Sequence, residues 1–283
     1  MAATVSSLTQ SLGEIPPESV VFGRTEAMRA LRERLQKLAG ANVPVLIQGE
    51  SGTGKDIIAR MIHGLSPWRT GPFVKVNCPA IPGTLLESEL FGYEKGAFTG
   101  AYGSKPGRVE MAHRGTLFLD EISELDSALQ SKLLQLLQDG QFCRIGAQED
   151  KKVEVRVVCA TNRQLEQEIA TGSFRQDLFY RINVVNLHMP PLRERAADVP
   201  ALVEFFLDYY NRKYNCRAAS FLTSSWPCCR STTGRATSAN WKTWSSATSS
   251  WVPKRPSAAT WSASIAMFSI RKFPLTGPSP SRS

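Results

Sequence analysis

A glycine-rich run that ends in lysine is the part of the sequence best suited to chemistry. It follows the apolar residues 43–47 and consists of Gly49, Glu50, Ser51, Gly52, Thr53, Gly54, Lys55 and Asp56. Glycines in such a loop let backbone N–H groups converge on phosphate oxygens, and the lysine neutralises charge on the β- and γ-phosphates. The run therefore predicts a phosphate-binding Walker A loop, with one departure: Asp56 stands where Ser or Thr ordinarily ligates Mg²⁺.

Two adjacent carboxylates follow a second apolar run. Residues 116–119 are followed directly by Asp120 and Glu121. Asp120 suits coordination of Mg²⁺, and Glu121 suits orientation of a water molecule for attack on the γ-phosphate. A buried strand with an acidic helix cap after it gives the same pattern, but a phosphate loop about 65 residues earlier favours the nucleotide interpretation.

A third apolar run, residues 155–160, ends at Thr161 and Asn162. A polar side chain at a strand end can sense the γ-phosphate or position the water. Because all three runs end in polar residues, they predict strands of one parallel sheet with the nucleotide at the carboxyl ends of the strands. We therefore expect an α/β fold in which helices flank a central parallel sheet.

Between the first two of these runs lies a nearly uncharged loop with one aromatic side chain at its tip. The loop is formed by Gly96, Ala97, Phe98, Thr99, Gly100 and Ala101. Small residues and a phenylalanine can also form an ordinary packed turn. The letters GAFTGA, however, are the signature of the AAA+ activators of sigma-54 RNA polymerase, the bacterial enhancer-binding proteins.

The chain resembles this family from about residue 19 to about residue 215. Similar segments on either side of the loop are residues 22–23, 76–78, 133–140, 174–181 and 190–195. The resemblance implies an AAA+ P-loop NTPase domain with ATP and Mg²⁺ as cofactors. It also accounts for Asp56, because members of the family commonly carry an acidic residue after the Walker lysine.

The resemblance implies a role for each matching position. Lys55 and the loop amides would hold ATP, Asp120 would bind Mg²⁺, and Glu121 would handle water. Asn77 is similar to the switch residue that hydrogen-bonds the catalytic glutamate, and Asn162 is similar to sensor I.

Further roles concern contacts with other subunits and with the polymerase. Arg175 and Arg181 resemble arginine fingers that reach the γ-phosphate of a neighbouring subunit. Their spacing alone is more typical of solvated helix residues, so these roles come from the family match. Fingers supplied in trans imply a ring of identical subunits, expected to be a hexamer. Phe98 and Thr99 would contact the sigma-54 holoenzyme.

Composition sets wider limits. The 283 residues are 42% hydrophobic, which supports a sizeable core. The sequence has no run of 18 apolar residues and no signal peptide, so we expect a cytoplasmic protein without a membrane segment. The six cysteines lack metal-binding spacing and are interpreted as reduced, structural thiols.

We expect a disordered leader (1–18), an AAA+ core (19–195) and the start of a helical lid (196–216).

Residues 217–283 differ from the rest of the chain. They contain nine Lys or Arg residues, no Asp or Glu, and five of the six tryptophans. Removing those nine from the 34 basic residues leaves 25, which balance the 25 acidic residues of positions 1–216. A basic segment with interspersed Trp could bind nucleic acid by charge and stacking. The family would instead complete its lid here with a sensor II motif, and many members add a DNA-binding helix-turn-helix; neither is visible, so we expect promoter DNA to be only an indirect partner.

We interpret this tail as out of frame and expect it to be disordered. Codons permitted for residues 229–244, when read from the third base of each codon, can encode QEYDWPGNIRELENL. That string contains the family's sensor II motif. The reading phase corresponds to loss of one nucleotide, or gain of two, upstream of about Arg230. Sequencing the gene tests this hypothesis, because codons incompatible with that string would exclude it.

The sequence therefore predicts an ATP-dependent activator that remodels the sigma-54 polymerase at promoters through the GAFTGA loop. Because the lid is truncated and sensor II is lost, ATP hydrolysis by this chain is expected to be impaired. The alternative is a module that binds nucleotide and sigma-54 without effective ATPase activity. A nucleic-acid-binding protein that uses the basic tail is a third interpretation, and salt-sensitive DNA affinity that depends on residues 217–283 would favour it.

Overall fold

A parallel sheet lies at the centre of the protein. The computed structural model describes residues 16–38 and 40–214. Five parallel strands form one sheet in the order β2-β5-β8-β1-β9. Their bounds are β1 Val45–Gly49, β2 Phe73–Asn77, β5 Gly115–Asp120, β8 Val155–Thr161 and β9 Val185–Met189.

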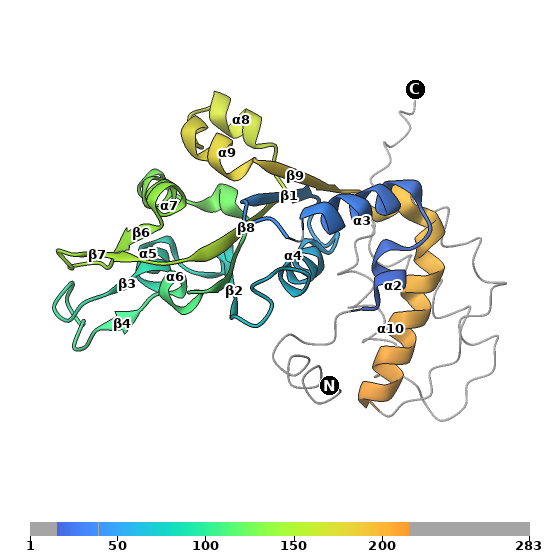
Figure 1. The fold of residues 1–283 in the computed structure, drawn as a ribbon, viewed down its shortest axis with the longest axis horizontal. Helices are drawn as coiled ribbons and strands as arrows, with labels where there is room; N and C mark the ends of the chain where they lie inside the picture. The colour runs from blue at the N-terminus through green and yellow to red at the C-terminus, as the bar shows by residue number, and fades with distance from the viewer. Residues whose placement is uncertain (1–15, 39, 215–283) are drawn as a thin grey trace, which may run out of the picture.

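Helices connect these strands and cover both faces of the sheet (Figure 1). The α-helices are α2 Glu18–Phe22, α3 Glu26–Leu38, α4 Lys55–Gly64, α5 Gly83–Phe91, α6 Arg108–Met111, α7 Ser127–Asp139, α8 Leu165–Ala170, α9 Gln176–Ile182 and α10 Val199–Tyr214. Short 3-10 helices are η1 Cys78–Ala80, η2 Ile122–Glu124 and η3 Leu192–Asp198. Two short antiparallel hairpins complete the fold: β3 Gly92–Tyr93 with β4 Lys105–Pro106, and β6 Gln141–Cys143 with β7 Asp150–Lys152.

Alternation along each strand divides the core into two layers. In β5, Leu117 and Leu119 belong to the cluster beneath α5, α7 and α9, whereas Phe118 belongs to the cluster beneath α3 and α4. In β8, Val157 and Val158 separate in the same way. Because successive side chains of a strand point to opposite faces, a nearly continuous apolar run serves both layers. The prediction of a parallel sheet flanked by helices is confirmed.

The two ends of the molecule differ in character. At one end, α10 runs beside α2; at the other, the β3–β4 and β6–β7 hairpins lie side by side (Figure 1). The expected boundary between core and lid at residues 195 and 196 falls inside η3, which leads directly into α10. Helix α10 starts at Val199, and Pro200 occupies its first turn, where proline is tolerated.

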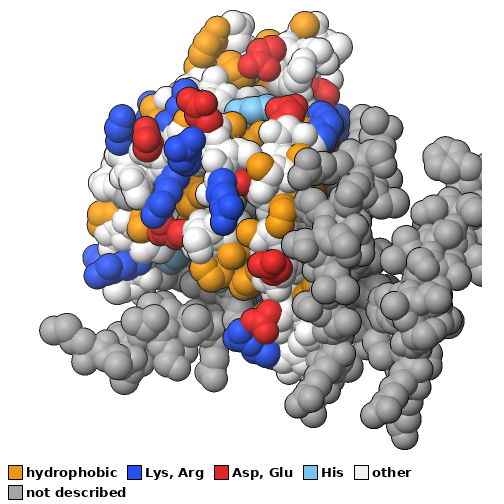
Figure 2. Space-filling model, turned by 90° about the vertical axis from the view of Figure 1, so that its right-hand side faces the viewer, with side chains coloured by type: hydrophobic (Ala, Val, Ile, Leu, Met, Phe, Trp, Pro, Cys, Tyr) orange, Lys and Arg blue, Asp and Glu red, His pale blue; other side chains and the backbone are white. Residues whose placement is uncertain are grey.

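Charges of both signs are distributed over the surface. Figure 2 views the molecule from the α10 end, and there basic and acidic side chains are interspersed on the part not drawn in grey. This distribution agrees with the charge balance of residues 1–216. In the described part of the chain, no helix combines the length and the apolar character needed to cross a bilayer. Three described cysteines, Cys78, Cys143 and Cys159, are free thiols. The predictions made for residues 1–15 and 217–283 fall outside the described residues.

Candidate nucleotide site

The glycine-rich loop joins the carboxyl end of β1 to the amino end of α4. Gly54 precedes the first residue of α4 with a φ of 100°, a left-handed backbone that an L side chain rarely adopts. The N–H of Thr53 and its hydroxyl both donate to the carbonyl of Glu50, at 3.3 and 2.8 Å. The loop is therefore closed on itself, and the positive end of the helix dipole lies at the loop. Asp56 lies in the first turn of α4, where a negative charge is favourable.

Lys55 connects the loop to the end of β5. Only 6% of its side chain is exposed, and its Nζ donates to the carbonyl oxygens of Gly49 at 2.9 Å and Glu50 at 3.3 Å. The same Nζ lies 3.2 Å from Oε1 of Glu121. The structure thus brings together the lysine and the glutamate that the sequence assigned to one site from positions far apart in the chain.

The two carboxylates occupy different environments. Asp120 ends β5, and its Oδ2 lies 3.0 Å from Nζ of Lys75, which comes from the neighbouring strand β2. Glu121 has a left-handed backbone with φ 56° and ψ 59°, and its Oε2 accepts a hydrogen bond from the main-chain N–H of Asn162 at 2.8 Å. Glu121 therefore has a fixed partner at the end of β8 as well as in the phosphate loop.

Asn77 lies at the same edge of the sheet. Parallel pairing of β2 with β5 places it opposite Asp120. Among the described residues, the recorded partners of the Glu121 side chain are Lys55 and the main chain of Asn162, and no hydrogen bond from Asn77 to this carboxylate is recorded. Asn77 thus lies next to Asp120, and its hydrogen bond to Glu121 stays a prediction. Next to Asn77, burial together with the charge of Asp120 raises the pKa of the Cys78 thiol to about 12, so this thiol stays protonated.

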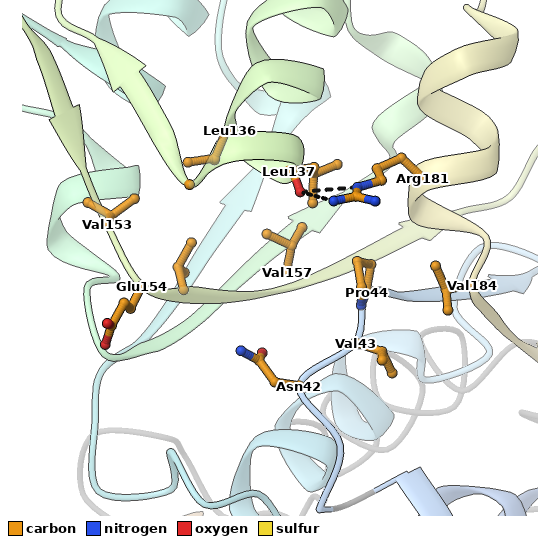
Figure 3. Close-up of a pocket in the computed structure, with 12 residues that line it drawn as sticks. Asn42, Val43, Pro44, Leu136, Leu137, Val153, Glu154, Val157, Arg181 and Val184 are labelled. Atoms are coloured by element: carbon orange, nitrogen blue, oxygen red, sulfur yellow. Dashed lines mark hydrogen bonds between the residues drawn. The ribbon is translucent and has the colours of Figure 1, made fainter.

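The two candidate arginine fingers lie apart from this cluster and contact α7. Arg175 precedes α9 and pairs with Asp177 at 2.6 Å, while its Nη1 donates to Ser131 at 3.1 Å. Arg181 donates from Nε and Nη2 to the carbonyl of Leu137, at 3.1 and 3.0 Å (Figure 3). Within one subunit, therefore, neither guanidinium is directed to the phosphate loop.

Arg181 borders a pocket of about 440 Å³ at the opposite edge of the sheet. Figure 3 shows that this pocket is lined mainly by apolar residues, and that Asn42 and Glu154 add polar groups to it. Residues 42–44 lead into β1 and residues 153–155 lead into β8, so the pocket lies at the amino ends of these strands. The phosphate loop follows the carboxyl end of β1, and the two features are therefore separate.

The GAFTGA loop forms the turn between β3 and β4. Hydrogen bonds from the N–H of Gly96 to the carbonyl of Ala101, and from the N–H of Ala101 to the carbonyl of Phe98, close it at 2.9 and 3.0 Å. The ring of Phe98 packs against Tyr93 with a centroid distance of 4.9 Å, yet 44% of the residue stays exposed. The loop thus presents its aromatic side chain at the surface, far along the molecule from α10 (Figure 1).

A half-buried arginine connects this loop to the second hairpin. Arg144, 11% exposed, donates to Glu94 at 2.9 Å and to both oxygens of Glu110 at 2.6–3.0 Å. Burial raises the pKa of Glu110, but its hydrogen bonds to Arg144 and the charge of Arg144 outweigh burial, so the net shift is downward. The turn after β6 also touches the loop, because a Cβ added at Gly146 would lie 2.8 Å from the Cβ of Ala97.

Sequence reasoning assigned no role to several residues that the fold brings to the site. Arg193 forms a bidentate ion pair with Glu50 of the phosphate loop, at 2.7 and 2.8 Å. Arg195 and Lys75 are further examples. The segment that contains Arg193 and Arg195 was noted only for its family likeness, and Lys75 stands two residues before Asn77 in the same strand. Alternation along β2, which places residues 75 and 77 on one face, could have identified Lys75.

Comparison with known proteins agrees with this geometry. The family profile of the Sigma-54 interaction domain matches residues 21–188. The Nif-specific regulatory protein of Herbaspirillum seropedicae is 56% identical over 198 residues, which are 70% of this chain and 36% of that protein. The Nif-specific regulatory protein of Azotobacter vinelandii is 53% identical over 196 residues, 69% of this chain and 38% of that protein. The chain thus spans between one third and two fifths of the length of these relatives.

A solved structure extends the comparison to the fold. NtrX from Brucella abortus in complex with ATP superposes with a TM-score of 0.77 at 32% identity, covering 91% of this chain and 59% of that one. At only 15% identity, Hsp104 superposes with a TM-score of 0.54 and covers 86% of this chain and 47% of that one, which shows the AAA+ fold alone. The family match covers more than half of the chain and contains both the phosphate loop and the GAFTGA loop. The chain therefore belongs to the sigma-54 interaction domain family of AAA+ P-loop proteins.

Proposed function

We propose that this chain is an ATP-dependent activator of sigma-54 RNA polymerase that couples ATP hydrolysis to remodelling of the closed promoter complex. The observation that carries the proposal is the contact of Lys55 with Glu121, which is in turn bonded to the main chain of Asn162. Phosphate loop, carboxylates and sensor position therefore meet at one edge of the sheet. The GAFTGA loop, exposed at the far end, supplies the surface for the sigma-54 holoenzyme.

The residues at this edge fit ATP and Mg²⁺. Magnesium in nucleotide sites is held by one or two carboxylates together with the phosphates, and Asp120 offers a carboxylate with 18% exposure at the end of β5. In the described part of the chain, no group of three or more His, Cys, Asp or Glu residues is placed to hold a metal ion. When bound at Asp120, Mg²⁺ would neutralise part of the charge on the phosphates.

Each protein group then has a distinct task. The amides of the loop and Lys55 bind the phosphates, and Asp120 takes the metal. Glu121, held by the N–H of Asn162, orients the attacking water and accepts its proton. Its Oε1 lies 3.2 Å from Nζ of Lys55, so the carboxylate borders the phosphate loop.

Completion of the site requires a second subunit. Arg175 immediately precedes α9 and Arg181 lies on it, and both contact α7 instead of the phosphate loop of their own chain. We assign them as fingers that reach the nucleotide of a neighbour in a ring, proposed to be a hexamer in the cytoplasm. Asn77, opposite Asp120, relays the state of the nucleotide toward the GAFTGA loop.

The test is steady-state ATP hydrolysis as a function of protein concentration, for the 283-residue chain and for a version in which the reading frame is restored before Arg230. The proposal expects hydrolysis that rises cooperatively with concentration in the restored chain. Loss of this activity in Lys55→Ala, with Lys37→Ala in α3 as a control, would localise it to the loop. Absence of hydrolysis at every concentration in the restored chain would contradict the proposal.

The same experiment addresses the alternative function, a nucleotide- and sigma-54-binding module without effective turnover. The alternative predicts that the 283-residue chain binds ATP and sigma-54 but hydrolyses no ATP. Equal hydrolysis by both chains would exclude it and would show that residues 217–283 do not impair the site.

A further inference from the structure

A second arginine of the segment between β9 and α10 reaches the phosphate loop from inside the protein. Arg195 lies in η3 and is only 3% exposed. Its Nη2 donates to the main-chain carbonyl of Thr53 at 2.8 Å, and its Nη1 lies 3.7 Å from the sulfur of Met28 in α3. The guanidinium is thus placed behind the loop, between the loop and α3.

Asp198 anchors the same segment to the chain before α3. It is 1% exposed, and it accepts hydrogen bonds from the N–H groups of Arg24 and Thr25 at 2.6 and 3.2 Å and from the Thr25 hydroxyl at 2.7 Å. Burial lowers the pKa of Arg195, and the charge of Asp198 offsets part of this effect. Arg195 and Asp198 therefore form a buried charged junction that connects the phosphate loop, the start of α3 and the start of α10.

The buried charges of this junction lower the stability of the fold, which a purely structural element would avoid. Within the described part of the chain, Nε of Arg195 is buried and has no hydrogen-bond partner. A buried donor without a partner and a desolvated charge both reduce stability, and an apolar side chain of similar volume would often pack there at no loss. The contact with the Thr53 carbonyl is what an apolar side chain could not replace.

That contact determines the direction of a loop amide. The carbonyl of Thr53 and the N–H of Gly54 belong to one planar trans peptide, so they point in opposite directions. When Arg195 holds the carbonyl from behind, the N–H of Gly54 is presented on the other side. Loop amides turned outward in this manner are what a phosphate requires.

We propose that Arg195 is a positioning residue of the phosphate loop, which fixes the peptide between Thr53 and Gly54 and links its orientation to the start of α10. The proposal rests on the proposed nucleotide-binding function. It differs from the role of Arg193, whose ion pair with Glu50 lies at the surface. A movement of α10 would then shift Arg195, and with it the peptide of the loop, because only residues 196–198 separate Arg195 from the start of α10.

The experiment compares two buried arginines in the full 283-residue chain. Arg156 in β8 is 1% exposed and donates Nη2 to the carbonyl of Leu38 at 2.9 Å, so it matches Arg195 in burial and bond type but contacts no residue of the loop through that bond. The variants are Arg195→Met, Arg195→Lys and Arg156→Met. The readouts are the dissociation constant for Mg-ATP, the rise in unfolding temperature on adding Mg-ATP, and the hydrogen-exchange rate of the Gly54 amide.

We expect Arg195→Met to weaken ATP binding about tenfold, as for loss of one hydrogen bond from a charged donor, and to speed exchange at Gly54. Arg195→Lys, which keeps the charge, should show a smaller loss of ATP affinity and a smaller increase in the exchange rate at Gly54. Arg156→Met lowers the unfolding temperature but leaves ATP affinity within about twofold and the ATP-induced rise intact. ATP affinity and Gly54 exchange equal to those of the parent chain in both Arg195 variants would overturn the inference.

Two outcomes need separate treatment. If Arg195→Met does not fold, Arg195→Lys decides, because the lysine cannot reproduce the guanidinium geometry and should still weaken ATP binding and loosen Gly54. If the parent chain binds no ATP, the proposed function fails. In that case exchange at Gly54 alone tests Arg195: faster exchange in Arg195→Lys supports the positioning role, and unchanged exchange refutes it.

Discussion

The ammonium group of Lys75 lies 3.0 Å from the carboxylate of Asp120 across the seam between β2 and β5. The same ammonium lies 5.5 Å from the centre of the Phe118 ring, so the side chain runs along one face of the sheet to reach the carboxylate. Each of the two carboxylates is therefore paired with a different lysine, Asp120 with Lys75 and Glu121 with Lys55.

Because a cation at Asp120 competes with a metal ion, Lys75→Met should lower the Mg²⁺ concentration needed for half-maximal ATP binding by about two- to fivefold, the range for a partly exposed ion pair. Lys132→Met is the matched control, since Lys132 also pairs with a glutamate, Glu87, and lies over a ring, that of Phe91, away from the loop. A titration of ATP binding against Mg²⁺ measures the effect. A higher Mg²⁺ requirement in Lys75→Met would mean that Lys75 holds Asp120 ready for the metal instead of competing with it.

Glu121→Gln should separate ATP binding from ATP hydrolysis. The amide oxygen can still accept the hydrogen bond from Asn162, but the charge that activates water is gone, so hydrolysis in the frame-restored chain should fall by about 10²- to 10⁴-fold. ATP affinity should change little. Glu124→Gln, three residues further on and paired with Arg163 at 2.5 Å, serves as the control and should retain hydrolysis. Comparable losses in both variants would argue against a specific role for Glu121.

Gly146→Ala should disturb the GAFTGA loop. Gly146 has a φ of 77° and its added Cβ would meet Ala97, whereas Gly172 has a φ of 78° and open space around it. Both alanine variants should lose about 1 kcal/mol of unfolding free energy from the left-handed backbone. Only Gly146→Ala should also speed hydrogen exchange of the amides in residues 96–101 and weaken binding to sigma-54. Identical exchange in the two variants would show that the contact with Ala97 does not hold the loop.

The stability of the protein should decline between pH 6.5 and pH 5.5 through His63. This side chain is 2% exposed, and burial first, then the charge of Arg156, lower its pKa. Below pH 6.5, His63 is protonated in the unfolded chain but stays neutral in the folded chain. The free energy of unfolding therefore falls as the pH falls, by up to about 1.4 kcal/mol per pH unit.

His63→Asn isolates this effect. Asn can retain a partner for the Thr116 hydroxyl, which lies 2.9 Å from Nδ1 of His63, but it does not titrate. Denaturant unfolding at pH 7.0, 6.5, 6.0 and 5.5 should therefore give a smaller slope for the variant. Parallel pH profiles for the two proteins would assign the slope to other groups.

The parts of the site that could be predicted from the sequence are those built by contiguous residues. The loop that ends at Lys55 and the pair Asp120–Glu121 each follow an apolar strand, and parallel strands bring their carboxyl ends to one edge. Periodicity and turn chemistry therefore suffice to place them. The GAFTGA loop was identifiable because its letters are unusual, although its closed conformation and the packing of Phe98 on Tyr93 were not.

The contacts that could not be predicted join residues far apart in the chain. Arg195 reaches Thr53 and Arg144 reaches Glu110 across 142 and 34 positions, and their roles depend on how η3 and the two hairpins pack. From sequence alone, an arginine in a helical or loop segment is interpreted as solvent-exposed, because its neighbours in space are unknown. The hydrogen bond from Asn162 to Glu121 was missed for a related reason. Its donor is a main-chain N–H, which leaves no signal in the pattern of side chains.

The left-handed backbone of Glu121 has a consequence for laboratory evolution. An L residue in this region costs about 1–2 kcal/mol relative to glycine, so Glu121→Gly would relieve strain at the end of β5. A library selected only for heat resistance would thus be expected to accumulate glycine at this position and to discard the carboxylate. Thermal screening of this domain would then enrich variants that are thermostable but inactive. A screen that measures ATP turnover as well as thermostability is needed to retain Glu121.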